Sequence, residues 1–574
     1  MENTQKPILI VGAGPAGITA ALTLNKLGHK AILIEKSKKL KYKIGESLLP
    51  GSLSIMDRLG LNDVVKKGNF VRKPSATFAW GTGERPFTFS FSTSKEQSWI
   101  YDHALQINRT EFEGLLLDEA KERGVEIRSG YSVTDIDLES NPNEVTIFCK
   151  DENDQEVALN GSYMIDASGV SGLIANKYNM REYDEFYRSM ALWTYYKGAK
   201  TFEGDLDGTT FSVTFEGGWI WIIPLKDDVF SVGVVVDYDR MKEIRSVGKD
   251  EFLKSCIESS PLAKEILEPA EQCDKVRQMT EWSYDTSAYY KNRSFLCGDS
   301  ACFTDPLFSQ GVYLGMSSAV MASAAIDYII KNPEQQKEVS EWYDNKYRST
   351  YLRYHEFLVS FYTYASNVEG DTPYWNKRRV SSILDNRFDN KTWFNALKNQ
   401  SDDKQEKALK DLYSKASNMV KLGVHQRDEV TEEFSDAELN SARIMWVAKT
   451  NKALNKMKTI KWMGNEVKLV ESYQIDPITF KMEKKLFLSD GEKMLHRYAL
   501  NENYVEIIND LEVNEIGYKE LIKKFKQVGT EDNSSQLIIR LLENDMLQGY
   551  DKNGEDVDFE KRLRFNGVGL EHVV

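Results

Sequence analysis

The beginning of the chain constrains the fold more than any other stretch, because two apolar runs there flank a glycine-rich turn. Residues 8–11 read ILIV and lead directly into GAGPAG at 12–17, and a second run, AILI at 31–34, ends at Glu35. Apolar runs of this length predict buried strands, and the segment between them has room for one helix. The sequence therefore predicts a βαβ unit with parallel strands, which is typical of α/β folds.

The glycines of this unit predict a dinucleotide-binding site. Gly12 would permit the tight turn, Gly14 would let the backbone approach a pyrophosphate, and Gly17 would let the helix pack on the strand. The pyrophosphate would lie at the helix N-terminus, beside Ala16, where free N–H groups and the helix dipole favour anions. Glu35 would bind a ribose hydroxyl. The alternative is a structural glycine turn, but strand, glycines, helix, strand and acid in register favour the nucleotide site.

The composition limits the compartment and the partners. The 574 residues are 41% hydrophobic and carry a net charge of −14 at pH 7, which argues against general affinity for nucleic acid or anionic membranes. No apolar run reaches about eighteen residues and no basic segment precedes the first one, so neither a membrane span nor a signal peptide is expected. The five cysteines form no CxxC pair and the six histidines are dispersed, so we expect a cytoplasmic protein without a metal site.

Two later segments favour FAD over NAD. Residues 163–169, YMIDASG, read as a strand that ends in a small-residue turn, after a β-meander pattern over 125–160. Residues 295–301, FLCGDSA, read as another strand that ends in a Gly-Asp pair, and a helix rich in small residues follows from Val312. With these segments the chain resembles the large family of FAD-dependent aromatic hydroxylases and their relatives.

The resemblance implies a Rossmann-like FAD-binding domain of the GR2 type, in which Asp299 binds the ribityl chain of the flavin. It also implies that Arg109, at the start of a predicted helix, contacts the flavin, and the alternative for Arg109 is a surface cap. No second strand–glycine–helix unit is found, so a separate NAD(P)H-flavin reductase would deliver reduced flavin. Hydroxylases of this superfamily bind NADPH without a second fingerprint, which leaves that alternative open.

Four further motifs resemble those of flavin-dependent halogenases within this superfamily. Paired tryptophans on a strand are more often ordinary core than functional surface, but here they occur with three other motifs in the family's order. The motifs are WIWIIP at 219–224, IGESLLP at 44–50, RKPSATFAWG at 72–81 and FTDPLFSQG at 303–311.

The resemblance assigns a role to each motif. Trp219, Trp221 and Pro224 would form a wall over the flavin that holds the organic substrate away while a small halide still reaches the cofactor. Alternation along a strand places both indoles on one face. Lys73 would be the catalytic lysine, and Ser47 would lie in the loop near the isoalloxazine.

The motif FTDPLFSQG at 303–311 would supply the halide site and further contacts with the flavin. Backbone N–H groups around Ser309, Gln310 and Gly311, at the start of a helix, would bind chloride or bromide. Pro306 and Gly311 would contact FAD. The sequence does not choose between the halides, because backbone donors bind either.

The implied reaction is halogenation of an aromatic compound. FADH2 and O2 would give a flavin hydroperoxide, a halide would take its distal oxygen to form a hypohalous acid, and Lys73 would activate the halogen. Lys73 would do so either by a hydrogen bond or by being halogenated itself, and in an apolar tunnel its pKa is expected to be lowered. Taken alone, Lys73 reads as a surface charge, and only its motif favours catalysis. The alternatives are an FAD-dependent monooxygenase, including one that acts on a protein-bound aromatic, and a flavin-dependent regulator.

One position departs from the tryptophan halogenase branch of that family. That branch has a glutamate in the halide loop where this chain has Phe308. The chain therefore looks more like the branch acting on phenols, pyrroles or carrier-protein-tethered aromatic groups. The substrate base stays open among Glu46, Asp102 and Asp305.

We predict three regions along the chain. Residues 1–330 would form the FAD-binding core, with β-sheet substrate-domain segments at about 60–110 and 185–284, and residues 335–450 would form a helical region over the substrate pocket. An aromatic stripe with helical spacing lies in that region, over 336–366, and such stripes are more often core than cofactor site. Residues 451–574 read as strands followed by three short helices, which hints at a winged-helix-like module. Because the chain is acidic, a protein-contact or structural role is favoured over DNA binding.

Overall fold

A computed structural model gives the arrangement of these segments. The described residues are 6–40, 42–79, 87–91, 101–184, 186–280, 283–369, 372–378, 425–427, 449–463, 468–489, 502–528, 538–539, 541–542, 546–559, 563–565 and 570–572. The chain divides into two compact units. The first comprises residues 1–404, 415–428 and 476–481, and the second comprises residues 405–414, 429–475 and 482–574.

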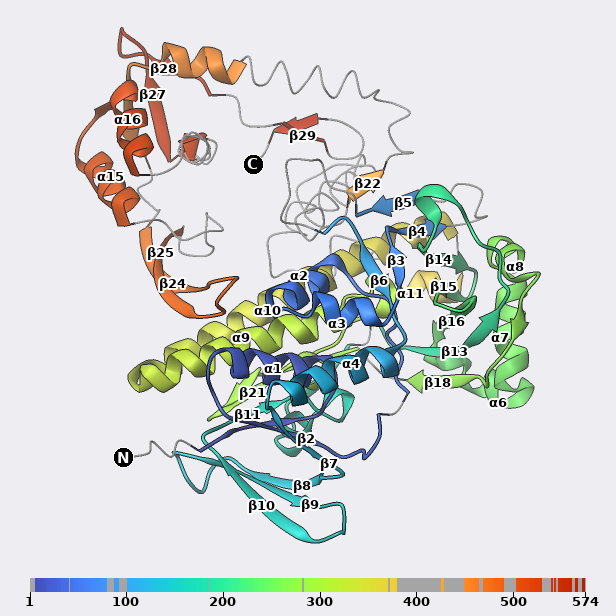
Figure 1. Cartoon of the computed structure of the whole chain (residues 1–574). Coiled ribbons are helices and arrows are strands. Elements are labelled where there is room, and N and C mark those ends of the chain that lie inside the picture. Colours follow the sequence, from blue (N-terminus) through green and yellow to red (C-terminus); the bar gives the residue numbers. More distant parts are fainter. Residues whose placement is uncertain are drawn as a thin grey trace. The chain divides into compact units, whose positions relative to one another are not determined.

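A six-stranded sheet in the order β20-β21-β11-β1-β2-β7 lies in the first unit (Figure 1). Its strands are β1 (Ile8–Val11), β2 (Ala31–Glu35), β7 (Glu126–Ser129), β11 (Tyr163–Asp166), β20 (Tyr290–Lys291) and β21 (Ser294–Leu296). All neighbouring pairs are parallel except β20 with β21. Helix α1 (Pro15–Lys26) connects β1 to β2, so the predicted βαβ unit and the α/β fold are confirmed.

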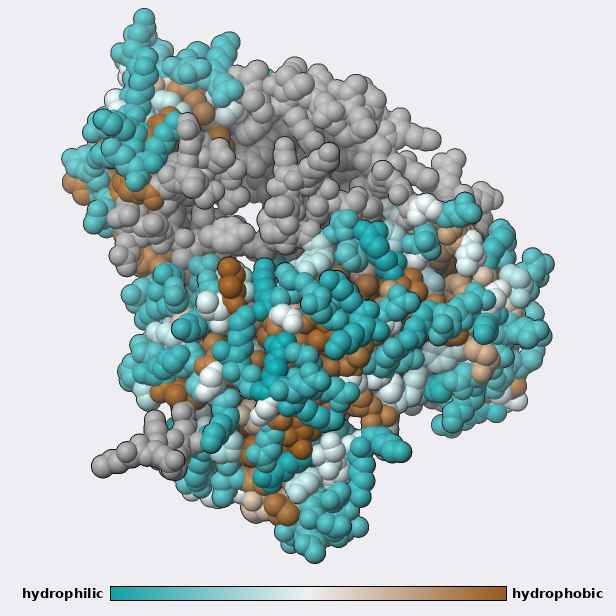
Figure 2. Space-filling view, viewed as in Figure 1, coloured by the Kyte–Doolittle hydropathy of each residue, from teal (hydrophilic) through white to brown (hydrophobic). Residues whose placement is uncertain are grey.

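Helix α9 (Gly311–Lys331) packs against α1. Of the helices that the structure describes, α9 alone is long and apolar enough to cross a membrane, but 78% of that stretch is buried inside the protein. Its hydrophobicity is therefore explained by its place in the core. On the face shown in Figure 2, the described surface is mainly hydrophilic, with hydrophobic residues in smaller patches.

The predicted β-meander forms an antiparallel sheet of β8 (Ser132–Asp137), β9 (Val145–Lys150) and β10 (Glu156–Gly161). The meander begins after β7, which pairs with β2 in the main sheet instead. The first unit also contains α2 (Pro50–Arg58), α3 (Asn62–Lys67), α4 (Arg109–Glu122) and α5 (Leu173–Lys177), and two short strand pairs. These pairs are β3 (Val71–Lys73) with β6 (Ala104–Gln106), and β12 (Arg181–Tyr183) with β19 (Tyr284–Thr286).

A nine-stranded sheet carries the paired tryptophans. Its order is β17-β13-β16-β15-β14-β4-β5-β22, with β18 beside β13. The strands are β4 (Ser75–Ala79), β5 (Phe87–Ser90), β13 (Ser189–Lys197), β14 (Thr210–Phe215), β15 (Gly218–Pro224), β16 (Val229–Asp237), β17 (Glu271–Gln272), β18 (Arg277–Thr280) and β22 (His425–Arg427).

The two faces of this sheet have different partners. Ile220 and Ile222 of β15 belong to the core cluster that includes Phe252 and Ile266, which lie on α7 (Lys249–Glu258) and α8 (Pro261–Leu267). Since side chains alternate along a strand, Trp219 and Trp221 face the opposite side, and they line the cavity described below.

The aromatic stripe lies on α10 (Gln336–Glu369), a 34-residue helix that is followed by α11 (Pro373–Lys377). The tyrosines that it buries are Tyr343, Tyr347, Tyr351, Tyr354 and Tyr362. They are three or four residues apart or multiples of that, as one face of a helix requires. These tyrosines therefore belong to the protein core, which is the alternative that the sequence analysis favoured over a cofactor site.

The second unit has a hydrophobic core of its own, which includes Ile460, Leu511, Leu521, Phe525 and Leu547. Its sheet has the order β26-β23-β27-β28. The elements are β23 (Thr459–Trp462), α15 (Glu502–Val513), β26 (Ile516–Gly517), α16 (Tyr518–Val528), β27 (Leu547–Tyr550) and β28 (Asp556–Val557). Two hairpins, β24 (Lys468–Ile475) with β25 (Met482–Ser489) and β29 (Leu563–Phe565) with β30 (Leu570–His572), complete it. Strands and helices are both present in this unit, as the sequence predicted, and the winged-helix-like arrangement stays a prediction.

Parts of three predictions lie outside the described residues. They are Trp80 and Gly81 of the lysine motif, much of the predicted helical region at 335–450, and most of the third C-terminal helix. The division of the chain at 330, 335 and 450 stays a prediction.

Candidate active site

One large cavity of about 1040 Å³ extends between the two main sheets of the first unit. Its lining residues come from the turn after β1 and the ends of β2 and β11, and also from β13, β14, β15 and β18. The carboxyl ends of parallel strands are where α/β proteins bind nucleotides. Ligand pockets measure roughly 300–1,000 Å³, so this one has the size that an extended dinucleotide needs.

The glycine turn has the geometry that a bound pyrophosphate requires. Gly12 has a φ of +103°, and a Cβ there would lie 2.3 Å from the carbonyl oxygen of Ala167. A Cβ at Gly17 would lie 1.8 Å from the carbonyl oxygen of Gly12, so only glycine lets α1 start this close to β1. Gly14 caps α1 without a side-chain hydrogen bond, which leaves the first N–H groups of the helix free for an anion. Gly12, Gly14 and Ala16 line the cavity, whereas Gly17 acts in packing.

Glu35 lies where a ribose would be bound. One of its carboxylate oxygens, Oε2, accepts a hydrogen bond from the N–H of Ala13 at 2.9 Å, and Oε1 accepts one from Ser37, also at 2.9 Å. The backbone thus fixes the carboxylate at the end of β2, where it lines the cavity. Each oxygen retains acceptor capacity for a sugar hydroxyl.

Arg109 and Asp299 line the middle of the same cavity. Arg109 is not a surface cap, because its guanidinium donates to the fully buried Glu113 and, at 2.7 Å, to the carbonyl of Ile44. Burial raises the pKa of the Asp299 carboxyl to about 6, and the positive charges of Arg109 and Lys43 oppose that rise. A cofactor with hydroxyl groups would satisfy this carboxyl.

Two of the three residues predicted to form the wall, both tryptophans, line the large cavity, and the third does not. Trp219 and Trp221 are both buried, their ring centroids are 6.0 Å apart, and both line the large cavity. Ile223 continues the lining on the same face of β15. Pro224 is not a lining residue, because alternation along the strand turns it to the opposite face.

The tryptophan N–H groups are held from behind by hydrogen bonds. The indole of Trp219 donates to the hydroxyl of Tyr362 at 2.7 Å, and Tyr362 donates to Oδ2 of Asp305 at 3.0 Å. The indole of Trp221 donates to Ser231 at 3.3 Å. The wall is therefore anchored to the halide loop, which contains Asp305, as well as to its own sheet.

Lys73 ends β3 inside the protein, with only 1% of its surface exposed. Its Nζ donates to Oγ of Ser47 at 2.7 Å and to the carbonyl of Leu48 at 3.2 Å, and it lies 5.4 Å from the centre of the Phe91 ring. Burial lowers the pKa of Lys73 to about 7, as the sequence led us to expect. No carboxylate in the described part of the chain bonds to this amine, so a large fraction of it is neutral near pH 7.

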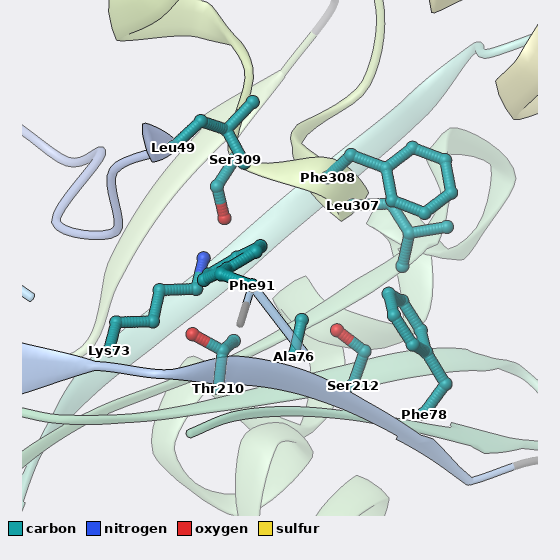
Figure 3. A pocket seen from close by; sticks show the side chains of 10 residues that line it. All are labelled: Leu49, Lys73, Ala76, Phe78, Phe91, Thr210, Ser212, Leu307, Phe308 and Ser309. Atoms are coloured by element: carbon teal, nitrogen blue, oxygen red, sulfur yellow. The ribbon is translucent and has the colours of Figure 1, made fainter. Parts of the chain in front are cut away.

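Lys73 lines a second, smaller pocket (Figure 3). The other lining residues are Leu49, Ala76, Phe78, Phe91, Thr210, Ser212, Leu307, Phe308 and Ser309. Its free volume of about 20 Å³ accommodates roughly one water-sized molecule, and its walls are mostly apolar. An aromatic substrate would have to displace side chains to enter.

Four residues line both cavities and define what we call the neck: Thr210, Ser212, Leu307 and Ser309. Three of the four carry hydroxyl groups, and in Figure 3 these surround the space that Lys73 and Phe91 also reach. These four residues thus form a common, mainly polar boundary between the pocket of Lys73 and the large cavity.

The halide loop reaches the cavity through some of its predicted residues. Pro306, Ser309 and Gly311 line the cavity, and α9 begins at Gly311 without a side-chain cap. The side chain of Gln310 is instead turned into the protein, where its amide donates to Thr304 at 2.8 Å and to the carbonyl of Asp305 at 2.6 Å. Gln310 therefore braces the loop, and only its backbone is available to an anion.

The three candidate substrate bases have different surroundings. Glu46 lines the large cavity, accepts a hydrogen bond from Tyr195, and has its pKa raised to about 7 by burial. Burial also raises the pKa of Asp305 to about 7, but this carboxyl lines neither cavity. Asp102 lies at the surface in ion pairs with Arg72 and His103. None of the three lines the pocket of Lys73.

Sequence reasoning missed Thr210, Ser212, Phe91 and Tyr362. The run TFSVTF at 210–215 could have indicated two of them, because alternation along a strand places the hydroxyls of Thr210 and Ser212 on the same face. Phe91 and Tyr362 reach the site only through the tertiary fold, and nothing in their local sequence indicated it.

Comparison with known proteins places this geometry among halogenases. The tryptophan halogenase family matches residues 7–103 and 97–427, and the C-terminal domain of chloramphenicol halogenase CmlS matches residues 446–562. The tryptophan 2-halogenase of Chondromyces crocatus is 33% identical over 377 residues, which are 65% of this chain and 70% of that protein. The sulochrin halogenase gedL of Aspergillus terreus is 32% identical over 373 residues, 60% of this chain and 67% of that protein.

Solved structures agree with these relatives. The flavin-dependent halogenase CmlS is 44% identical and superposes with a TM-score of 0.80, covering 99% of this chain and 100% of its own. The myxobacterial chondrochloren halogenase CndH, a variant of the FAD-dependent halogenases, is 30% identical with a TM-score of 0.62, covering 67% of this chain and 88% of its own. The similarity to CmlS thus extends through both units.

Proposed function

The chain belongs to the tryptophan halogenase family and is a flavin-dependent halogenase, and on this premise we propose that it halogenates an electron-rich aromatic ring, a phenol or a pyrrole. The observation that carries the proposal is the buried amine of Lys73, which is separated from the flavin cavity by the neck. The co-substrates are O2 and chloride or bromide.

FAD fits the large cavity by the chemistry of the residues that line it. The free N–H groups at the start of α1 suit the pyrophosphate, Glu35 suits a ribose hydroxyl, and Arg109 and Asp299 suit the ribityl chain and the ring. When bound and reduced, FAD supplies with O2 the oxidising equivalent that turns a halide into hypohalous acid. A separate NAD(P)H-flavin reductase would supply reduced flavin, and the scattered cysteines favour a cytoplasmic location.

The wall and the neck select what moves between the cavities. Trp219 and Trp221 close the flavin cavity against a ring-sized molecule, so the organic substrate stays on the Lys73 side. A hypohalous acid is much smaller than an aromatic ring, and the three hydroxyl groups of the neck can hydrogen-bond it as it passes. Lys73 then holds and activates the halogen through its nitrogen, by a hydrogen bond or as a haloamine.

The shape of the small pocket supports an electron-rich substrate. Phe308 occupies the position of the glutamate of tryptophan halogenases and packs edge-to-face on Phe78, with centroids 5.8 Å apart. With no carboxylate in the pocket lining, activation depends on Lys73 and on the electron density of the substrate ring. A phenol or pyrrole meets that requirement, either free or tethered to a carrier protein. We assign the C-terminal unit to contact with this substrate or with a protein partner.

The test supplies the purified enzyme with a flavin reductase, NADH, O2 and either halide, together with phenol and pyrrole probes. Product with the halogen isotope pattern on a ring carbon supports the proposal. Product that carries oxygen in place of halogen identifies a monooxygenase instead. Halogen found by fragmentation on a carbon outside the ring overturns the aromatic assignment but not the halogenase activity.

A further inference from the structure

A chain of four buried polar side chains starts at Lys73 and ends at Gln106. Lys73 bonds to Ser47 at 2.7 Å, the hydroxyls of Ser47 and Thr210 are 3.2 Å apart, and the amide nitrogen of Gln106 donates to Thr210 at 2.8 Å. The exposed fraction is 5% or less for each of the four. So many linked polar groups in an apolar pocket wall are costly to bury unless each is bonded in a definite geometry.

The Gln106 end of this chain has a fixed direction. Its Nε2 also donates to the carbonyl of Gly208 at 3.1 Å, and a carbonyl can only accept. Rotating the amide by half a turn would place two oxygens against each other, so Nε2 is the atom that faces Thr210. Gln106 is thereby a rigid donor that holds the Thr210 hydroxyl in place.

The Lys73 end is fixed in the same way. The carbonyl of Leu48 accepts from Nζ, and Ser47 occupies a second position around the nitrogen. A lysine nitrogen has four tetrahedral positions, of which Cε takes one. Leu48 and Ser47 take two more, so a single position is left. It carries the third N–H in the charged form and the lone pair in the neutral amine.

The partners of Lys73 are neutral, which matters for its charge. A carboxylate at this place would raise the pKa of the amine, whereas a hydroxyl and a carbonyl leave the effect of burial uncompensated. The same two groups therefore orient the nitrogen without holding it in the charged state. The loop that contains the IGESLLP motif supplies both of them.

We propose that Ser47 is the positioning residue of Lys73: held by Thr210 and Gln106, it leaves the amine one free direction, aimed at the halogen species arriving through the neck. This inference rests on the proposed function. It gives Ser47 a role toward the lysine, beyond the flavin-loop role that its motif implied.

The first test compares variants that remove or keep the hydroxyls. Ser47→Ala and Thr210→Val should lower halogenated product per O2 consumed by on the order of tenfold to a hundredfold, the loss expected when a reacting group is misplaced by about 1 Å. Because Ser47 and Thr210 also line the large cavity, product is normalised to the O2 that each variant consumes, so a change in flavin reoxidation does not enter the ratio. The missing product should appear as hypohalous acid that escapes into solution, where a 1,3-diketone traps it. Ser47→Thr and Thr210→Ser keep the hydroxyls and should restore most of the product.

A matched control removes a buried hydroxyl elsewhere. Ser323 lies on α9 and donates to the carbonyl of Ala319 within that helix, at 2.8 Å. Ser323→Ala should behave like the parent enzyme in both readouts. Equal product per O2 in Ser47→Ala and Ser323→Ala would overturn the positioning role.

The second test needs no reduced flavin. Cysteine and methionine sulfur consume hypochlorous acid before amines do, so the acid is added at pH 7 in steps beyond the amount that the 16 methionines and five cysteines take up. Peptide mass mapping then measures chlorine on Lys73. In this step the amine nitrogen displaces hydroxide from chlorine, the N–Cl bond forms as the O–Cl bond breaks, and the amine proton joins the hydroxide as water. The buried Lys73 is compared only with itself, as the chlorinated fraction in each variant at the same dose of reagent.

Chlorination of Lys73 should fall several-fold in Ser47→Ala and be retained in Ser47→Thr. Undiminished labelling in Ser47→Ala would contradict the inference. The two proposals fail separately, because an enzyme that makes no halogenated product refutes the proposed function, while the labelling still decides whether Ser47 positions Lys73.

Discussion

Trp219 of the aromatic wall and Asp305 of the halide loop are joined by a single side chain, the phenol of Tyr362, which accepts a hydrogen bond from the first and donates one to the second. Residues from β15, the halide loop and α10 are thus tied together behind the flavin cavity. The wall cannot shift without disturbing the loop that would bind the halide.

Removing this hydroxyl should destabilise the protein and loosen the coupling of the reaction. Tyr362→Phe leaves the Trp219 N–H and the Asp305 carboxyl without this partner, and each unpaired buried group costs about 1–3 kcal/mol. We expect a lower melting temperature and more hydrogen peroxide released per halogenated product, measured side by side. Tyr354→Phe is the control, since within the described residues the Tyr354 hydroxyl has no hydrogen-bond partner. Equal melting temperatures for both variants would show that the link is not stabilising.

Opening the wall should have a different effect from removing the lysine. Trp221→Ala leaves Lys73 intact but removes a large side chain from the cavity lining. We expect faster peroxide release and a lower yield of halogenated product, without conversion to a hydroxylase, because the remaining sheet still separates the substrate from the flavin. Unchanged peroxide release and product yield would contradict the role of the wall. Hydroxylated product would show instead that Trp221 alone keeps the substrate from the flavin, and mass spectrometry of the product distinguishes the cases.

Replacing the lysine should separate the two halves of the reaction. In Lys73→Ala, flavin reoxidation should continue at the parent rate, because the large cavity is unchanged. Halogenation should fall by on the order of a thousandfold, since the variant loses the group that activates and aims the halogen. Oxygen consumption and halogenated product are measured in one assay with the halide varied. Near-normal halogenation would refute the relay through Lys73.

Asp305 should make the stability of the fold depend on pH. Its pKa is raised by burial to about 7, so between about pH 4 and 7 the native state holds a proton that the unfolded chain releases. The stabilisation is complete below pH ~4 and is lost as the pH rises through 7. Asp305→Asn should flatten the fall of the unfolding free energy over that range. Burial raises the pKa of Glu46 as well, so in Asp305→Asn the unfolding free energy should still fall with pH, but less steeply. Urea unfolding at a series of pH values measures it, and an unchanged slope would show that Asp305 does not carry a raised pKa.

Flavin binding should depend on the absence of a side chain at Gly14. A Cβ at this position would point toward Lys43, 3.7 Å from its Nζ, in the part of the cavity where the pyrophosphate fits. Gly14→Val should therefore purify with little flavin, as absorbance near the flavin band reports. Gly114→Ala in α4 is the control, because its Cβ would make an ordinary contact of 3.6 Å and alanine favours helices. Full flavin occupancy in Gly14→Val would refute the assigned site.

The sequence was sufficient where local chemistry determines structure. The run from Ile8 to Glu35 forms the predicted strand, turn, helix and strand, because glycine positions and apolar runs act over a few residues. Alternation along β15 placed Trp219 and Trp221 on one face correctly. The same rule applied to Pro224 points to Ile223 as the next lining residue, which the motif taken as a unit did not indicate.

Other features depend on contacts between distant segments. Lys73 is anchored by Ser47, 26 residues earlier, and through it by Thr210, on a strand far along the chain. Tyr362 reaches Trp219 across 143 residues. Periodicity in the sequence relates only neighbouring residues, so it does not predict these pairs. The partners come together only when the chain has folded. The orientation of the Gln310 side chain was not predictable from the sequence either. Its amide donates to Thr304 and is therefore not available to an anion.

The neck has a consequence for how such an enzyme can change over evolutionary time. Ala76, Phe78, Phe91 and Phe308 line the lysine pocket and are absent from the lining of the flavin cavity. Substitutions at these positions can change the shape of the Lys73 pocket and leave the lining of the large cavity as it is. If the two spaces exchange only a small reagent, as proposed, the preference for the organic substrate can change during evolution while the flavin chemistry stays the same.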